Sequence, residues 1–270
     1  MKHLLRLGTL TLIISGFLTG DNVYRNLRNE SFSTGEFLEY RVHLGFINAG
    51  FATLHVSEDI FTINHRPCFK ADIIGESAGI LDVFYNVRNN WGTYIDTASI
   101  VPHRAYRYIA ENRYRKNEIV NFEHSTDTAI VSKLDKKTRE LKRKVYYPIP
   151  HNVQDIVSGY YFLRTIDYDL MTVGDTLTVA AFFDEEVYHL NIIYLGKDEV
   201  KTKFGHINAY VLSPIMPENK LFRGTHPIKV WLSNDKNKVP LKIKAAMFVG
   251  SIEVDLKSYK NLRNPLNFVD

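Results

Sequence analysis

The chain has 270 residues, of which 34 are Lys or Arg and 30 are Asp or Glu, and its net charge at neutral pH is +4. A balance this close to neutrality does not favour a nucleic-acid-binding protein. The 16 Tyr and 16 Phe residues favour a sheet-rich fold, because aromatic side chains suit half-buried strands.

The first twenty residues have the plan of a secretory signal peptide. Lys2 and Arg6 precede an uncharged, largely apolar run over residues 7–18, which is shorter than the roughly 20 residues of a membrane-spanning helix. Small residues follow the run, so we expect cleavage near Gly20. The alternative is an uncleaved N-terminal anchor. No linker rich in Pro, Gly or Ser divides residues 21–270, which predicts a single antiparallel β domain.

The leader predicts export to the periplasm or outer envelope. The only cysteine, Cys68, lies far from the end of the apolar run, so a lipid-anchored lipoprotein is not expected. It also excludes an intramolecular disulfide, which leaves stability dependent on the core. We expect a soluble protein with peripheral or no membrane contact.

The first half of the mature chain consists of short strand-like runs separated by turn residues. In the first run Leu38, Tyr40 and Val42 fall on one face, and later the polar residues 124–127 predict a hairpin. The runs are 37–44, 51–56, 67–74, a strand pair or bent strand over 83–96, 104–110, 118–122, 128–132 and 139–147.

A single amphipathic helix is predicted next, over about 152–167. Apolar residues recur at spacings of three and four through residues 153–166, which is typical of a helix with one apolar face. Asn152 is the expected N-cap, and Asp155 would place negative charge in the first turn. Asp155 and Ser158 are expected on the polar side of the helix.

Strand-like runs then resume to the end of the chain. A turn is expected at 196–198. No helical crossovers separate the runs, so the sheet should be antiparallel. The fold class predicted is mainly β, a large curled antiparallel sheet or open barrel with the one helix packed on it. The runs are 176–183, 187–194, 199–204, 207–213, 228–233, 239–246 and 251–256.

Arg164 falls on the apolar side of the predicted helix, where an unpaired charge would be costly. Possible partners are Glu36, Asp82 and Asp235. The guanidinium either holds an anion in a pocket, forms a structural ion pair between helix and sheet, or reaches water from a buried stem. The candidate ligand-binding residues are Arg164, Tyr160, Trp231 and Asp235.

Evidence for catalysis is weaker. Residues 75–79 match the G-x-S-x-G elbow around Ser77, but residues 80–94 are expected to be strand, whereas the elbow needs a following helix and a parallel sheet. No pair of His residues has metal-ligand spacing on a helix, so neither a metal, a cofactor nor a catalytic residue is assigned. The basic stretch 133–144 either touches lipid phosphates or an acidic polysaccharide, or forms a solvated hairpin edge.

Four segments together resemble the domain-of-unknown-function family DUF3108, a family of exported Gram-negative envelope proteins. They are 35–40, 49–52, 155–164 and 230–240, in this order and spacing. The resemblance implies a signal-bearing envelope protein with a large curled antiparallel sheet or barrel, and it transfers no catalytic residues. In outline the chain is also similar to half-barrel lipoprotein carriers, at the level of fold alone.

Export, abundant aromatic residues and a curled sheet together favour a non-enzymatic protein that binds an apolar or amphipathic ligand, a lipid or a glycan. One alternative is a structural or assembly partner of another envelope protein. Further alternatives are a hydrolase that uses Ser77 and an outer-membrane β-barrel, against which the mid-chain helix and charge-rich strands argue.

Overall fold

The computed structural model describes residues 24–215, 226–248 and 250–269, and the predicted leader lies outside them. All strand pairs are antiparallel and belong to one fourteen-stranded sheet, which confirms the predicted fold class. The first eight strands are β1 Phe37–Leu44, β2 Ile47–Ile63, β3 Arg66–Ser77, β4 Arg88–Asp96, β5 Pro102–Glu111, β6 Tyr114–Glu123, β7 Thr128–Leu134 and β8 Leu141–Pro148. The remaining six are β9 Thr176–Phe183, β10 Glu186–Thr202, β11 Gly205–Pro214, β12 Ile228–Ser233, β13 Pro240–Ala246 and β14 Ser251–Lys260.

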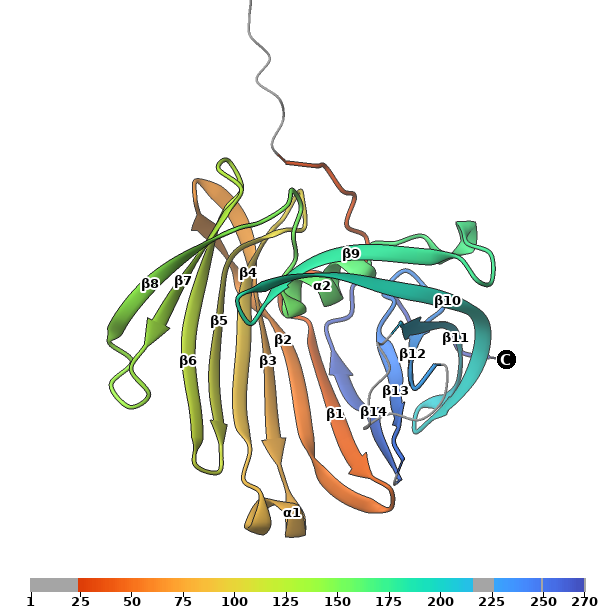
Figure 1. Ribbon diagram of the computed structural model, residues 1–270. Coiled ribbons are helices and arrows are strands. Elements are labelled where there is room, and N and C mark those ends of the chain that lie inside the picture. Colours follow the sequence, from red (N-terminus) through yellow and green to blue (C-terminus); the bar gives the residue numbers. More distant parts are fainter. Residues whose placement is uncertain (1–23, 216–225, 249, 270) are drawn as a thin grey trace, which may run out of the picture.

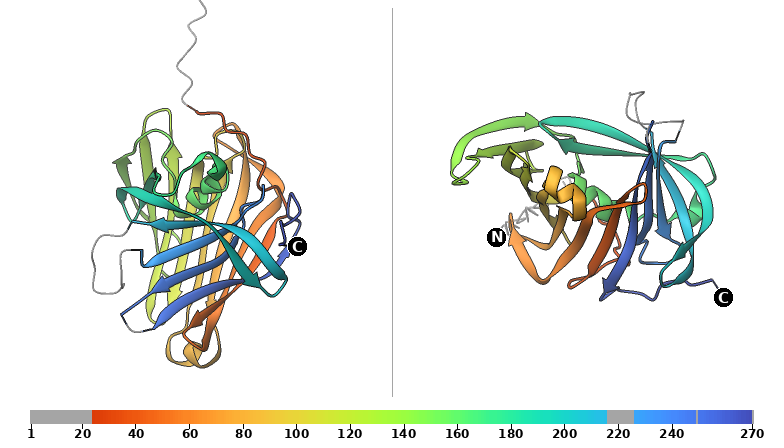
Figure 2. Two further views of the ribbon diagram at one scale, coloured as in Figure 1. Left: turned by 90° about the vertical axis from the view of Figure 1, so that its right-hand side faces the viewer. Right: turned by 90° about the horizontal axis from the view of Figure 1, so that it is seen from below.

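The sheet consists of two meanders joined through β1 and β14. The strand order runs from β8 back to β1, then through β14 to β9, so the sheet is not closed and β8 and β9 are its two edges. These edge strands are consecutive in the chain, and the connection between them, residues 149–175, must cross from one edge to the other. That connection contains helix α2, Ile156–Leu163, and the short 3-10 helix η1, Tyr168–Leu170. The sheet curls around α2 (Figure 1 and Figure 2, right).

Two of the predicted elements, the strand over residues 80–94 and the turn at 196–198, are wrong. Residues 80–94 do not form a strand throughout, because helix α1, Gly79–Phe84, precedes β4. Gly79 has a φ of +61°, which turns the chain away from β3. The turn predicted at 196–198 is instead a bulge within β10, and Gly196 supports it with a φ of +101°.

Helix α2 is shorter than predicted, and Asp155 rather than Asn152 is its N-cap. The Asp155 carboxylate accepts hydrogen bonds from the backbone N–H groups of Val157, at 2.7 Å, and Ser158, at 3.2 Å, while the Ser158 hydroxyl accepts from the Asp155 N–H. This is a capping box. Asn152 lies outside the helix with a φ of +57°.

The expected polar face of α2 is also wrong, because Asp155 and Ser158 are both buried. The helix lies inside the curled sheet, where β4 contacts both its N-cap, Asp155, and its apolar residues Val157 and Tyr161. Thr93 of β4 donates a hydrogen bond of 2.7 Å to the Asp155 carboxylate. Burial raises the pKa of Asp155 and outweighs the opposing effect of these hydrogen bonds.

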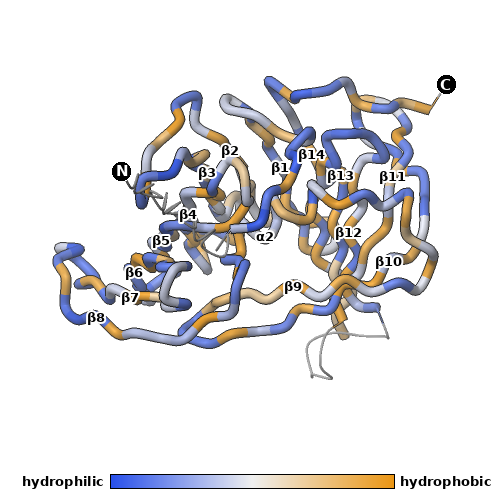
Figure 3. The backbone as a smooth tube through the Cα atoms, turned by 90° about the horizontal axis from the view of Figure 1, so that it is seen from above, coloured by the Kyte–Doolittle hydropathy of each residue, from blue (hydrophilic) through white to orange (hydrophobic). Residues whose placement is uncertain are grey.

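The hydrophobic core surrounds α2 and continues along the sheet. Val157 and Tyr161 of the helix pack with Phe32, Val56 and Ile95. Hydrophobic and hydrophilic residues follow one another along the strands, as expected for strands with one buried face (Figure 3). Within the described residues, no helix is long and apolar enough to span a bilayer.

Candidate functional site

A cavity of about 270 Å³ lies between α2 and the half of the sheet formed by β9 to β13. It is larger than the roughly 150 Å³ apolar cavities that bind benzene. The lining is almost wholly apolar. The helix and its two flanking residues contribute Asp155, Ile156, Gly159, Tyr160, Leu163 and Arg164, and the strands contribute Val179, Ala181, Leu190, Ile192, Leu212, Pro214, Val230, Leu232, Pro240 and Ile243.

The periodicity of each element explains which residues line the cavity. Positions 156, 159, 160 and 163 fall on one face of α2. On β12, Val230 and Leu232 face the cavity, and the intervening Trp231 points to the other side of the sheet. Ile156 and Leu190 keep 43% and 44% of their surface exposed, so the cavity is open to solvent beside them.

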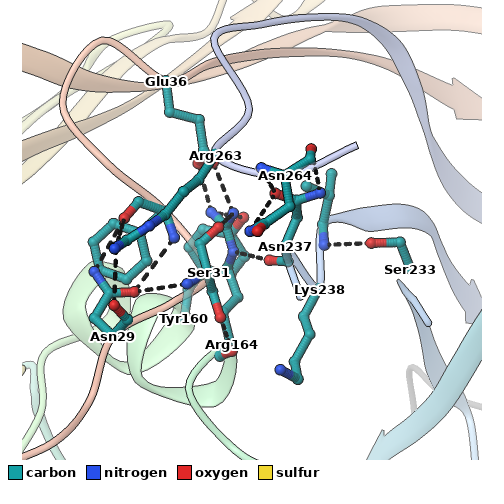
Figure 4. A network of polar contacts seen from close by, with 12 residues as sticks. Asn29, Ser31, Glu36, Tyr160, Arg164, Ser233, Asn237, Lys238, Arg263 and Asn264 are labelled. Atoms are coloured by element: carbon teal, nitrogen blue, oxygen red, sulfur yellow. Dashed lines mark hydrogen bonds and ion pairs between the residues drawn. The ribbon is translucent and has the colours of Figure 1, made fainter. Parts of the chain in front are cut away.

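Arg164, at the C-terminal end of α2, forms a buried two-point ion pair with Glu36 (Figure 4). Its two terminal nitrogens donate hydrogen bonds of 2.5 and 2.7 Å to the two carboxylate oxygens. Burial alone would lower the pKa of Arg164, but the Glu36 carboxylate holds it above its ordinary value. Of the three predicted partners, the structure therefore selects Glu36.

All five N–H donors of the Arg164 guanidinium have acceptors within the protein. Besides the two bonds to Glu36, Nε donates to the carbonyl oxygen of Asn237, at 2.8 Å. The terminal nitrogens also donate to the carbonyl oxygen of Ser31 and to the hydroxyl of Tyr160, both at 3.2 Å. This arrangement agrees with the structural ion pair among the alternatives, and a direct ligand contact by Arg164 stays a prediction.

The structure brings only two of the four candidate ligand-binding residues together. Tyr160 and Arg164 both line the cavity. Trp231 lies on the other side of the sheet, where its Nε1 donates to Asp198 at 2.9 Å. Asp235 organises the turn before β13 and accepts hydrogen bonds from the Ser233 hydroxyl and from backbone N–H groups. Neither Trp231 nor Asp235 lines the cavity.

Ser77 ends β3 and is followed by a helix, contrary to our expectation, but its surroundings differ from a nucleophile elbow. Its hydroxyl donates to Asp82, at 2.5 Å, and accepts from the backbone N–H of Val87, at 2.7 Å. Arg88 also contacts it. None of its partners in the described residues is a histidine, and β3 belongs to an antiparallel sheet.

Side chains, rather than backbone hydrogen bonds, join the two ends of the sheet. The turn between β9 and β10 presents Asp184 and Glu185 to strands β5 to β7. Asp184 forms ion pairs with Arg107, at 2.8 Å, and with Lys116. Glu185 pairs with Lys133, which places the start of the basic stretch 133–144 in this contact. We call residues 182–185 the clasp.

Aromatic packing accompanies the ion pairs of the clasp. Phe183 stacks on Trp91 of β4, with ring centroids 5.7 Å apart and ring planes 16° apart. Phe182 packs edge-on against Phe122 of β6. Lys116 and Arg107 lower the pKa of Asp184, and Lys133 and the Tyr147 hydroxyl lower that of Glu185. The clasp therefore combines an apolar contact with charged contacts that require ionised carboxylates.

The cavity wall was not identified from the sequence. Its lining residues are scattered over five strands, and only the register of the sheet brings them together. The alternation of the strands indicated which residues share a face, but not which face turns toward α2.

In the described residues no three His, Cys, Asp or Glu side chains are arranged to hold a metal ion.

Solved structures resemble this fold without close sequence similarity. One is a β-barrel-like protein of the domain of unknown function DUF1849 from Brucella abortus. It has 8% sequence identity and a TM-score of 0.54, and the match covers 85% of this chain and 99% of that one. Another is a provisionally named lipoprotein from Parabacteroides distasonis, with 12% identity, a TM-score of 0.32 and coverage of 87% and 100%. The first shares the fold of this chain, whereas the second is too different in structure to show a shared fold.

No curated protein matches this chain in sequence. The family model of DUF3108, a protein family of unknown function, matches residues 39–257. This match spans every strand from β2 to β13 and most of β1 and β14. The chain therefore belongs to the DUF3108 family.

Proposed function

We propose that this protein is a non-enzymatic carrier that holds the apolar part of an amphipathic ligand, a lipid, in the cavity between α2 and β9 to β13. The observation that carries the proposal is the almost wholly apolar surface of the cavity. The two charged residues in its lining, Asp155 and Arg164, have their polar groups hydrogen-bonded within the protein. Water molecules in this cavity would have few hydrogen-bond partners. Hydrocarbon that moves from water into the cavity is stabilised by about 0.8 kcal/mol per buried methylene group. The same lining disfavours a glycan, whose hydroxyl groups would lose their hydrogen bonds.

The sheet edge that forms the cavity wall offers a route of entry. Val179 and Ala181 on β9, and Leu190 and Ile192 on β10, line the cavity. The same hairpin ends in the clasp, so separation of the clasp from β5 to β8 would move the wall. Together with the predicted leader, this supports a role in carrying a lipid within the cell envelope.

The test measures binding of an apolar fluorophore, N-phenyl-1-naphthylamine, to protein from which bound lipid has been extracted. Leu190→Arg places a charge at the cavity rim, where the side chain is already part-exposed, so the fold should persist. We expect this variant to lose affinity about tenfold or more. Leu141→Arg is the matched control, because Leu141 is exposed on β8 and does not line the cavity.

Mass spectrometry of the organic extract supplies a second readout, because a carrier purified from its own envelope should retain lipid. The proposal is overturned if the fluorophore does not bind, or if Leu190→Arg binds it as well as the control variant does. Displacement of the fluorophore by a long-chain fatty acid, but not by a neutral oligosaccharide, would support a lipid ligand.

A further inference from the structure

One end of the sheet carries large apolar side chains that no other part of the described protein covers. It is the end that bears α1, at the bottom of Figure 1. Phe46, in the turn between β1 and β2, is fully exposed. In α1, Val83 is 81% and Phe84 74% exposed, and Phe248, after β13, is 61% exposed. We call this end, residues 44–47, 79–85 and 248, the apolar rim.

Backbone contacts show that these segments form one continuous rim. The Ala78 N–H donates to the carbonyl oxygen of Ala49, at 2.9 Å, which joins the start of α1 to β2. The Gly45 N–H donates to the carbonyl oxygen of Ser251, also at 2.9 Å, which joins the β1–β2 turn to β14. The turn between β5 and β6 lies on the other side of α1, since the Asn112 side chain contacts the end of that helix.

The orientation of α1 is the reverse of that expected for a helix packed on a core. Asp82, its only charged residue, is directed toward the protein, where it accepts from Ser77 and forms an ion pair with Arg88 at 2.8 Å. Val83 and Phe84 point outward, and none of the six helical residues is buried. A water-facing helix gains nothing from this orientation, so another apolar phase is needed to explain it.

The charges around the apolar rim indicate which kind of apolar surface would cover it. Residues 44–57 contain no Lys, Arg, Asp or Glu, and Arg88 neutralises Asp82. In the neighbouring turn Arg113 is exposed, and Arg115 donates only to backbone carbonyl oxygens, so no acid in the described residues neutralises either guanidinium. The same turn also carries Glu111, which accepts hydrogen bonds from Tyr85 and Asn89, so residues 111–115 have a net charge of +1. Apolar tips with a net positive turn behind them complement a bilayer surface that contains anionic lipid.

We propose that the apolar rim inserts into the interfacial layer of a membrane that contains anionic phospholipid. Phe46 and the outer face of α1 would enter the boundary between headgroups and acyl chains. Tyr85 and Tyr114, which are 50% and 53% exposed, would lie at headgroup level, where amphipathic rings are favoured. Tips from separate turns fit a fluid surface better than a protein partner that adds a strand, because in the described residues the free edges of the sheet are β8 and β9, away from these tips.

This inference concerns a different surface from the cavity, since none of the rim residues lines it. It therefore stands or falls separately from the proposed carrier function. If both hold, the rim would bring the protein to the membrane from which an amphipathic ligand is taken or to which it is delivered.

The first experiment is flotation of the purified full chain with vesicles of equal parts phosphatidylcholine and phosphatidylglycerol. Phe46→Ser combined with Phe84→Ser should reduce the bound fraction about tenfold, because two exposed aromatic anchors are lost without change to the core. The matched control combines Leu141→Ser with Leu170→Ser, two exposed apolar residues away from the rim. All proteins compared carry the same N-terminal residues, so any contribution from the leader is equal.

The second experiment reports where the rim lies. Phe46→Trp adds a fluorophore at the tip, and vesicles with brominated acyl chains should quench the added emission more than that of the parent's own tryptophans. Arg113→Gln should weaken binding to the anionic vesicles and leave binding to pure phosphatidylcholine unchanged.

The proposal is overturned if the rim and control variants bind vesicles equally, or if bromine does not quench the added tryptophan. It is also overturned if vesicles do not bind while a crosslinker at position 46 captures one protein, since the rim would then be a protein-docking surface. Rim variants should keep their affinity for N-phenyl-1-naphthylamine. Loss of vesicle binding can therefore be distinguished from loss of ligand binding in the cavity.

Discussion

The guanidinium of Arg164 and the carboxylate of Glu36 lie 128 positions apart in the chain and meet as a buried two-point ion pair. Glu36 directly precedes β1, and Arg164 directly follows α2. Because Arg164 also donates to Ser31 and Asn237, the pair ties the helix to the segment before β1 and to the turn before β13. This contact holds α2 in place as one wall of the apolar cavity.

Removal of one partner of this pair should be strongly destabilising. We expect Arg164→Met to lower the free energy of unfolding by about 3–5 kcal/mol, because Glu36 would remain buried without its partner. Urea unfolding followed by circular dichroism measures the loss. The double variant Arg164→Met with Glu36→Gln should lose less free energy of unfolding than the two single variants lose together.

A more exposed ion pair provides the comparison. Lys244 pairs with Glu253 at 2.8 Å on the sheet surface, and Lys242 also neutralises Glu253. Lys244→Met should cost less than about 1 kcal/mol. If Arg164→Met were no more costly than Lys244→Met, the buried pair would not be a major support of α2.

The clasp should weaken at acidic pH. Its ion pairs lower the pKa values of Asp184 and Glu185 from their ordinary values of 3.8 and 4.5. Their stabilisation is therefore complete above the ordinary values and is lost as the pH falls through the lowered ones. Emission of Trp91, which stacks on Phe183, should shift to the red below about pH 4 in a Trp231→Phe background. Added salt should favour the same change, since these contacts are partly exposed.

Charge-neutral variants test the cause of that transition. Asp184→Asn with Glu185→Gln should show red-shifted Trp91 emission already at neutral pH and little further change in acid. Glu186→Gln is the control, because the carboxylate of the adjacent Glu186 accepts a hydrogen bond from Tyr188 and forms no ion pair among the described residues, so this variant should keep the acid transition. An unchanged acid transition in the double variant would rule out the clasp carboxylates as its source.

Two glycines should respond to alanine in opposite ways. In α2, a Cβ added at Gly159 would come no closer than 3.5 Å to Gln154, so Gly159→Ala should stabilise the protein by about 0.5–1 kcal/mol through helix propensity. In β4, a Cβ at Gly92 would lie 2.1 Å from the ring of Tyr106. This ring is held in place because its hydroxyl donates a hydrogen bond to Asp72. Gly92→Ala should therefore cost about 1–3 kcal/mol. Thermal unfolding of the two variants checks both signs, and a stabilised Gly92→Ala would contradict this packing.

Local sequence patterns predicted most strands. The errors occur where contacts between residues far apart in the sequence determine the local structure. The runs 176–183 and 228–233 coincide with β9 and β12, because alternation and turn residues are read over a few neighbouring positions. The stretch after Ser77 became α1 because Gly79 redirects the chain and Asp82 bonds back to Ser77 and Arg88. Tyr160 and Arg164 were placed beside the cavity by helical periodicity, whereas no local signal marked its strand wall.

Composition and periodicity by themselves determined a mainly antiparallel sheet with one central amphipathic helix and an inward arginine, because these properties depend on residue type and short spacing. Tertiary structure alone decided that β1 pairs with β14, that Glu36 neutralises Arg164, and that the polar side of α2 is buried too. Each of these depends on how a sheet whose strands are distributed over residues 37–260 curls on itself. That curvature arises from strand twist and bulges accumulated over fourteen strands, and a short stretch of sequence does not encode it.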